Sequence, residues 1–112
     1  MINSDLTSIE HFLETGQKQS IQRCMYLNLP ELQFFQWCQQ QYKINKGVYN
    51  TIDSWFFQKG IGSILNRRIY ILAFLDFVIK TGQHDNQTKY LRFGNGGLTK
   101  ALQHFFNYIE RS

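Results

Sequence analysis

The amino-acid sequence predicts an all-α fold: a single domain, residues 1–112, built as a bundle of five or six helices. Apolar residues recur at steps of three and four along most of the chain, which is the period of a helix with one buried face. Apolar residues make up 43% of the sequence and aromatic residues 16%, enough to bury a core in one domain of this length. No internal repeat, linker or second domain is visible in the sequence.

The first two helices are expected over residues 7–16 and 18–27. Thr7 and Glu10 have the spacing of a capping box, and Gly16 stands where a left-handed residue would end the first helix. The second helix turns Cys24 inward. Cys24 and Cys38 are interpreted as buried thiols, with a disulfide or a metal pair as the alternative.

The third helix is expected in "NLPELQFFQWCQQQYK", residues 28–43. Asn28 can cap it, Pro30 is tolerated in its first turn, and Glu31 suits the positive end of the helix dipole. Its inner stripe consists of apolar residues at steps of three and four: Leu32, Phe35, Cys38 and Tyr42, widened by Phe34 and Trp37. A short fourth helix follows over residues 50–60, with Gly60 at its end.

The fifth helix is expected at the centre of the bundle, over about residues 63–81. Ten of the eleven residues from 69 to 79 are apolar, so this helix should be buried nearly all round. A buried strand is the competing interpretation, but a typical strand of about 5 to 6 residues is much shorter. A thin, mostly polar seam at helical spacing is expected at or near the surface: Asn66, Tyr70, Ala73, Asp76 and Lys80. An amphipathic helix over residues 98–109 ends the bundle.

The N-terminus is acidic and has no apolar signal region, and the apolar run 69–79 is too short to span a bilayer, which takes about 20 residues. A cytoplasmic protein without a membrane partner is therefore expected. Three scattered histidines and two cysteines without a CxxC spacing predict no metal site and no cofactor. No nucleophile or ordered acid–base group is recognisable, so the sequence predicts a protein that is not an enzyme.

Three glycines in "KYLRFGNGGLTKAL", residues 89–102, precede the last helix. Neither the Walker A order nor the dinucleotide fingerprint is present. The simpler interpretation is a turn in which glycines supply positive φ angles. The alternative is a phosphate contact at the helix N-terminus, made by Lys89, Arg92, Gly96, Gly97 and Lys100.

The net charge is +4, and the middle of the chain is its most basic part. Arg67 and Arg68 stand early in the central helix, where positive charge opposes the helix dipole. An anionic partner explains them, and so does an internal ion pair with Glu10, Glu14 or Asp53. Three further cations stand near predicted helix ends: Lys43, Lys46 and Lys59.

Two functions follow from this charge. The first is a nucleic-acid-associated subunit that contacts the phosphate backbone without reading sequence, through the basic residues named above. The second is a protein-binding regulator, such as an inhibitor, immunity protein or assembly adaptor, that binds an acidic protein through basic residues and exposed aromatic rings. With either function, the chain could be part of a larger assembly or a homo-oligomer. Aromatic side chains that could remain at the surface are Phe34, Phe57, Phe74 and Phe106. A groove-reading helix-turn-helix is disfavoured, because its second helix would be too apolar.

Overall fold

The computed structural model describes residues 24–80, 93 and 96–111. All regular secondary structure in these residues is helical. A short 3-10 helix η1, Cys24–Asn28, precedes four α-helices: α3, Glu31–Tyr42; α4, Lys46–Gln58; α5, Ile64–Lys80; and α6, Gly97–Arg111. No strand occurs within this part of the chain. The all-α prediction is confirmed, although the four α-helices of the described residues do not exactly match the predicted count of five or six. The helix predicted over residues 7–16 lies outside the described residues.

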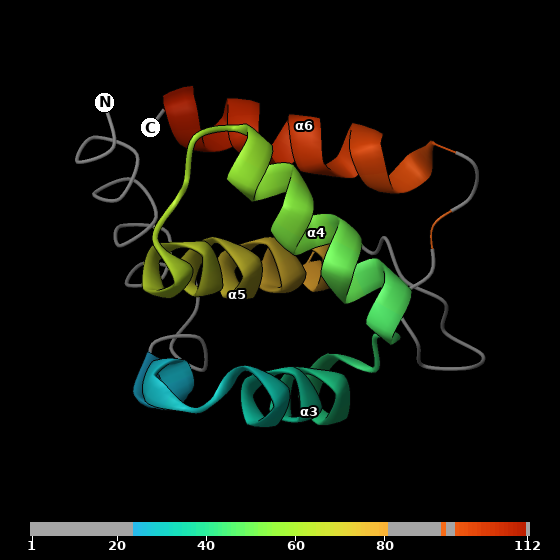
Figure 1. The fold of residues 1–112 in the computed structure, drawn as a ribbon. Coiled ribbons are helices and arrows are strands. Elements are labelled where there is room, and N and C mark those ends of the chain that lie inside the picture. The colour runs from blue at the N-terminus through green and yellow to red at the C-terminus, as the bar shows by residue number, and fades with distance from the viewer. Residues whose placement is uncertain (1–23, 81–92, 94–95, 112) are drawn as a thin grey trace.

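The central position of α5 organises the molecule. Figure 1 shows α5 in the middle, with α6 along one side, α3 along the opposite side and α4 crossing obliquely between them. The strongest contacts join α4 to α5, and η1 and α6 also pack directly on α5. Every described helix therefore either touches α5 or packs on a helix that does.

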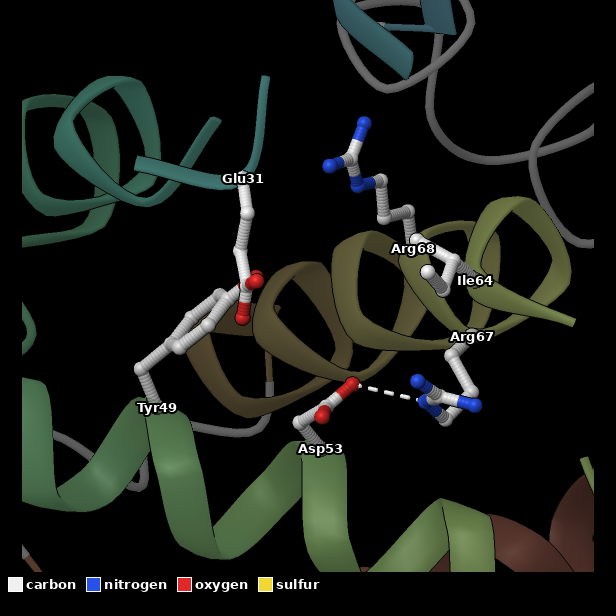
Figure 2. A pocket seen from close by; sticks show the side chains of 6 residues that line it. All are labelled: Glu31, Tyr49, Asp53, Ile64, Arg67 and Arg68. Atoms are coloured by element: carbon white, nitrogen blue, oxygen red, sulfur yellow. Dashed lines mark hydrogen bonds and ion pairs between the residues drawn. The ribbon is translucent and has the colours of Figure 1, made fainter. Parts of the chain in front are cut away.

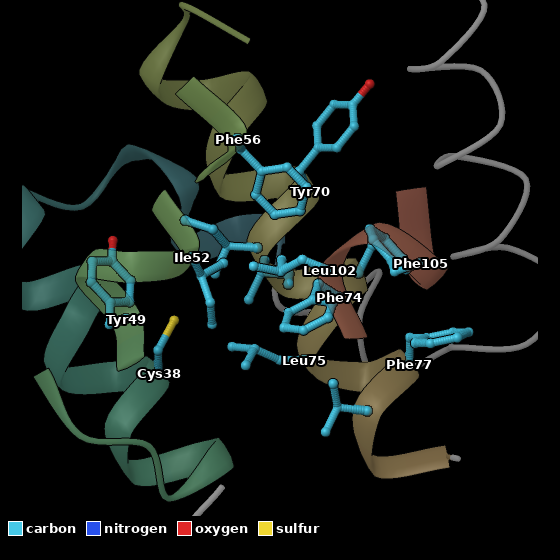
Figure 3. Close-up of a cluster of buried hydrophobic side chains, with 14 of the residues drawn as sticks. Cys38, Tyr49, Ile52, Phe56, Tyr70, Phe74, Leu75, Phe77, Leu102 and Phe105 are labelled. Atoms are coloured by element: carbon cyan, nitrogen blue, oxygen red, sulfur yellow. The ribbon is translucent and has the colours of Figure 1, made fainter. Parts of the chain in front are cut away.

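The core is continuous along α5 and rich in aromatic rings (Figure 3). Residues 70–78 are all buried. Phe105 of α6 lies 5.5 Å from Phe74 and 5.4 Å from Phe77, measured between ring centroids, and Phe56 of α4 lies 6.2 Å from Phe105. Offset and edge-on contacts at these distances are the favoured geometry for aromatic rings. These rings tie α4, α5 and α6 into one core.

The predicted polar seam of the central helix is wrong at its three middle positions, whereas Asn66 is partly exposed and the side chain of Lys80 lies outside the described residues. Tyr70 is 1% exposed and Asp76 is 5% exposed, and Ala73 is also buried. The bundle covers α5 on this side as well, so its polar groups must find partners inside the protein. Asp76 finds one in Tyr42 of α3, whose hydroxyl donates to Oδ1 at 2.7 Å.

The start of α4 lies four residues before the predicted position. Asn45 caps this helix, because its Oδ1 accepts a hydrogen bond from the Val48 amide at 2.8 Å. Gly47 lies within the first turn of this helix. The predicted end is confirmed: Gly60, with φ of 100°, follows the helix.

Of the four aromatic side chains proposed for the surface, only Phe57 is clearly exposed. Phe34 and Phe74, proposed as surface residues, are fully buried, and Phe106 is partly buried. Phe57 remains at the surface and is 59% exposed. Leu32 was expected in the inner stripe of α3, but it is equally exposed. No helix among the described residues combines the length and apolar character needed to cross a membrane.

Candidate nucleic-acid interface

Three of the predicted cations lie at the two ends of α4. Lys43 ends α3 and Lys46 begins α4, whereas Lys59 follows the last residue of α4. A helix of 13 residues is about 20 Å long, so the two groups are separated by that length. Lys100 lies in the first turn of α6, and Figure 1 shows this end of α6 on the same side as the start of α4.

The lysines of this set are exposed, and two of them rest on aromatic rings. Lys46 Nζ lies 4.5 Å from the centroid of Phe35, and Lys59 Nζ lies 5.0 Å from that of Trp55. Such contacts hold the side chain against the protein and leave the ammonium group open to water. Lys43, Lys46, Lys59 and Lys100 can therefore meet an anion without a rearrangement of the helices.

Arg67 binds within the protein (Figure 2). Its Nε donates to Asp53 Oδ1 at 2.8 Å, which is the internal ion pair that the sequence offered as an alternative. Its Nη1 donates to the carbonyl oxygens of Ile61 at 3.0 Å and Gly62 at 2.8 Å. The guanidinium also lies 5.3 Å from the centroid of Phe57. One side chain thus fixes the connection between α4 and α5.

Arg68 binds backbone carbonyls that sequence reasoning did not anticipate. It is 6% exposed, and its Nη1 donates to the carbonyl oxygens of Leu27 and Leu29, the latter at 2.6 Å. Its guanidinium lies 4.7 Å from the centroid of Phe34. These contacts hold the segment before α3 against α5. Carbonyl partners carry no residue-type signal, so no sequence pattern could have found them. The assignment of Arg68 as a nucleic-acid contact stays a prediction.

A shallow pocket lies between α3, α4 and α5 (Figure 2). Its lining combines two carboxylates and two guanidinium groups with two less polar residues: Glu31, Tyr49, Asp53, Ile64, Arg67 and Arg68. The opposite charges balance, so the pocket offers no net attraction for an anion. Burial raises the pKa of the Tyr49 hydroxyl above its ordinary value, which keeps this group neutral.

The glycine segment before α6 is described in part. Gly96 has φ of 73°, as the turn interpretation requires, and its carbonyl accepts from the Lys100 amide at 3.1 Å in the first turn of α6. Gly97 opens the helix. Lys89 and Arg92 lie outside the described residues, so the phosphate-contact alternative stays a prediction. Within the described segments, no group of three or more His, Cys, Asp or Glu side chains could hold a metal ion.

Comparison with known proteins adds one informative similarity. No protein-family model and no solved structure matches the chain. The sequence is 46% identical over 98 residues to the RNA-binding riboflavin kinase RibR of Bacillus subtilis (strain 168). The matched region is 87% of this chain but 42% of the relative, so the chain spans less than half of that protein's length.

This similarity corrects one prediction. The sequence was expected to encode a protein that is not an enzyme, whereas the relative is named as a kinase. The prediction failed because it rested on the absence of familiar catalytic motifs, and an absent motif carries little information about unfamiliar sites.

Proposed function

We propose that this chain binds RNA and takes part in the activity of an RNA-binding riboflavin kinase. The observation that carries the proposal is the 46% identity to RibR, which extends over 87% of the chain. Identity at this level along nearly the whole length supports a shared fold and a shared role. The all-α bundle supplies the rigid scaffold for that role.

The exposed lysines support RNA as the partner. Lys43 and Lys46 lie together at the turn between α3 and α4, and Lys59 and Lys100 extend the positive charge to other helix ends. Phosphate contacts of this kind position a protein on nucleic acid without reading its sequence. The net charge of +4 favours the encounter with a polyanion.

The test of RNA binding is a fluorescence-anisotropy titration of the full 112-residue chain with labelled RNA over a series of salt concentrations. Affinity should fall steeply with salt, because bound phosphates release counterions. Replacing Lys43 and Lys46 together by Gln should reduce the slope of log K against log salt by about 1.4 for single-stranded RNA. The matched variant with Arg at both positions keeps the charge and should keep the slope. No RNA binding at low salt would overturn the proposal.

A second function, riboflavin phosphorylation, is favoured by the name of the same relative. The purified chain is incubated with ATP, Mg²⁺ and riboflavin, and phosphorylated riboflavin is separated by chromatography. Product formation by this chain would place phosphoryl transfer within these 112 residues. The assay is run with and without RNA, so that an effect of RNA on the reaction is detected in the same experiment.

A further inference from the structure

We propose that the exposed ring of Phe57, backed by the guanidinium of Arg67, is a platform on which one unpaired RNA base stacks. This inference rests on the RNA binding proposed above and makes it specific: the preferred substrate is single-stranded RNA. The contact would add an aromatic component to phosphate binding by the lysines.

The position of Phe57 in α4 explains why its ring faces solvent. Phe56, its neighbour, is fully buried and packs against Tyr70 with 5.3 Å between ring centroids. Consecutive residues on a helix point about 100° apart, so Phe57 is directed away from the core. It is 59% exposed, the largest exposed fraction of any aromatic side chain in the described part of the chain.

Arg67 makes this exposed ring a rigid surface. Its guanidinium lies 5.3 Å from the ring centroid and is held by three hydrogen bonds, to Asp53 and to the carbonyls of Ile61 and Gly62. A ring supported in this way loses little conformational freedom when a base stacks on it. Among the described residues, the remaining guanidinium nitrogen, Nη2, has no hydrogen-bond acceptor and can donate to a phosphate of the same nucleotide.

The surroundings of Phe57 favour a nucleotide over a protein partner. A stable protein interface buries about 800 Å² on each side, and its core is depleted of charged residues. Phe57 instead adjoins the charged pair Arg67–Asp53, and both members of this pair line the pocket together with two further charged side chains. A single aromatic ring with a cation against it matches the size and chemistry of one base with its phosphate.

Stacking on Phe57 requires a base with an open face. In an RNA duplex both faces of each base are covered by neighbouring base pairs, whereas unpaired bases can turn outward onto an aromatic side chain. The platform therefore predicts a preference for single-stranded RNA and tolerance of sequence, because every base has a π-face.

The experiment uses the full chain and a single-stranded RNA that contains 2-aminopurine, whose fluorescence is quenched by stacking. Binding of the unmodified chain should quench the probe. Phe57→Leu keeps an apolar side chain but removes the ring, so it should abolish the quenching and weaken binding roughly tenfold. Phe57→Tyr should retain both. Leu32→Ala changes an equally exposed apolar residue on α3 and serves as the matched control.

The outcomes separate this inference from the proposed function. Failure of the unmodified chain to bind any RNA removes both. The stacking platform is overturned if the unmodified chain binds single-stranded and duplex RNA with equal affinity and Phe57→Leu quenches 2-aminopurine as strongly as the unmodified chain does. That result leaves the proposed phosphate binding intact. Replacement of Lys43 and Lys46 by Gln should lower affinity without altering the quenching at saturation. If the unmodified chain self-associates and Phe57→Leu abolishes this association without changing RNA affinity, Phe57 is a protein contact. This result would also overturn the platform.

Discussion

Two polar side chains meet inside the apolar core, where an unsatisfied group would be costly. The Tyr42 hydroxyl donates to Asp76 Oδ1 at 2.7 Å, and both residues are almost fully buried. A hydrogen bond to a buried carboxyl group contributes more to stability than one between neutral groups at the surface. This contact also joins α3 directly to α5.

Tyr42→Phe removes the donor and leaves the carboxyl group in place, so we expect it to lower the free energy of unfolding by about 1–3 kcal/mol. Urea denaturation followed by tryptophan fluorescence measures the change. Tyr26→Phe, at a partly buried ring stacked on Trp37, is the control and should change stability by less than about 0.5 kcal/mol. A double-mutant cycle with Asp76→Asn should show coupling between the two positions.

Tyr49 is expected to make the free energy of unfolding fall at alkaline pH. Burial raises the pKa of its hydroxyl, whereas in the unfolded chain this group ionises near its ordinary value of about 10. The stabilisation from the neutral hydroxyl is therefore complete below pH 10 and is lost as the pH rises above 10, where only the unfolded state ionises. Tyr49→Phe should flatten the fall in urea midpoint above pH 10. An identical fall in both proteins would contradict this assignment.

At the scale of elements, the beginning of α4 depends on one side chain. Asn45 accepts a hydrogen bond from Val48, and the first turn of the helix has no acidic residue to stabilise the positive end of its dipole. Asn45→Ala should therefore cost about 1 kcal/mol in thermal or urea unfolding. The same substitution at Asn50, which is exposed within α4, is the matched control and should be neutral or slightly stabilising. Equal effects at both positions would show that Asn45 is not an effective cap.

Sequence periodicity predicts the elements whose apolar pattern is long and regular. The helices α3, α5 and α6 begin and end within a few residues of their predicted positions. The start of α4 was missed because Asn45 was not considered as a cap. The seam on α5 failed for another reason. A polar residue on a helix is expected to face solvent only if no buried partner is available. The partner of Asp76 is Tyr42, which lies 34 positions away in the chain.

The candidate site could be predicted in its residue types but not in its geometry. Of the lysines proposed from the sequence, the four within the described residues are at the surface: Lys43, Lys46, Lys59 and Lys100. Arg67 and Arg68 look equivalent in sequence, yet one pairs with Asp53 and the other binds main-chain carbonyls. Adjacent helical residues face different neighbours, and those neighbours are set by tertiary packing. The exposure of Phe57, in contrast, was proposed from the sequence and is confirmed.

For the whole molecule, stability should depend on the centre of α5 far more than on its surface. Phe74 is fully buried against Phe56 and Phe105, so Phe74→Ala should lower the free energy of unfolding by about 3–5 kcal/mol. Phe57→Ala removes the same side chain from an exposed position and should cost less than about 1 kcal/mol. Thermal unfolding monitored by circular dichroism compares the two. Similar losses would contradict the arrangement of the core.

The covering of α5 by α6 has a consequence for biosynthesis. Phe74 and Phe77 find their partner Phe105 only near the end of the described chain. A growing polypeptide therefore exposes the most apolar stretch of the chain until α6 has left the ribosome. Chains truncated before residue 97 lack α6 and should therefore be bound by chaperones or degraded, and should not fold into a smaller functional protein.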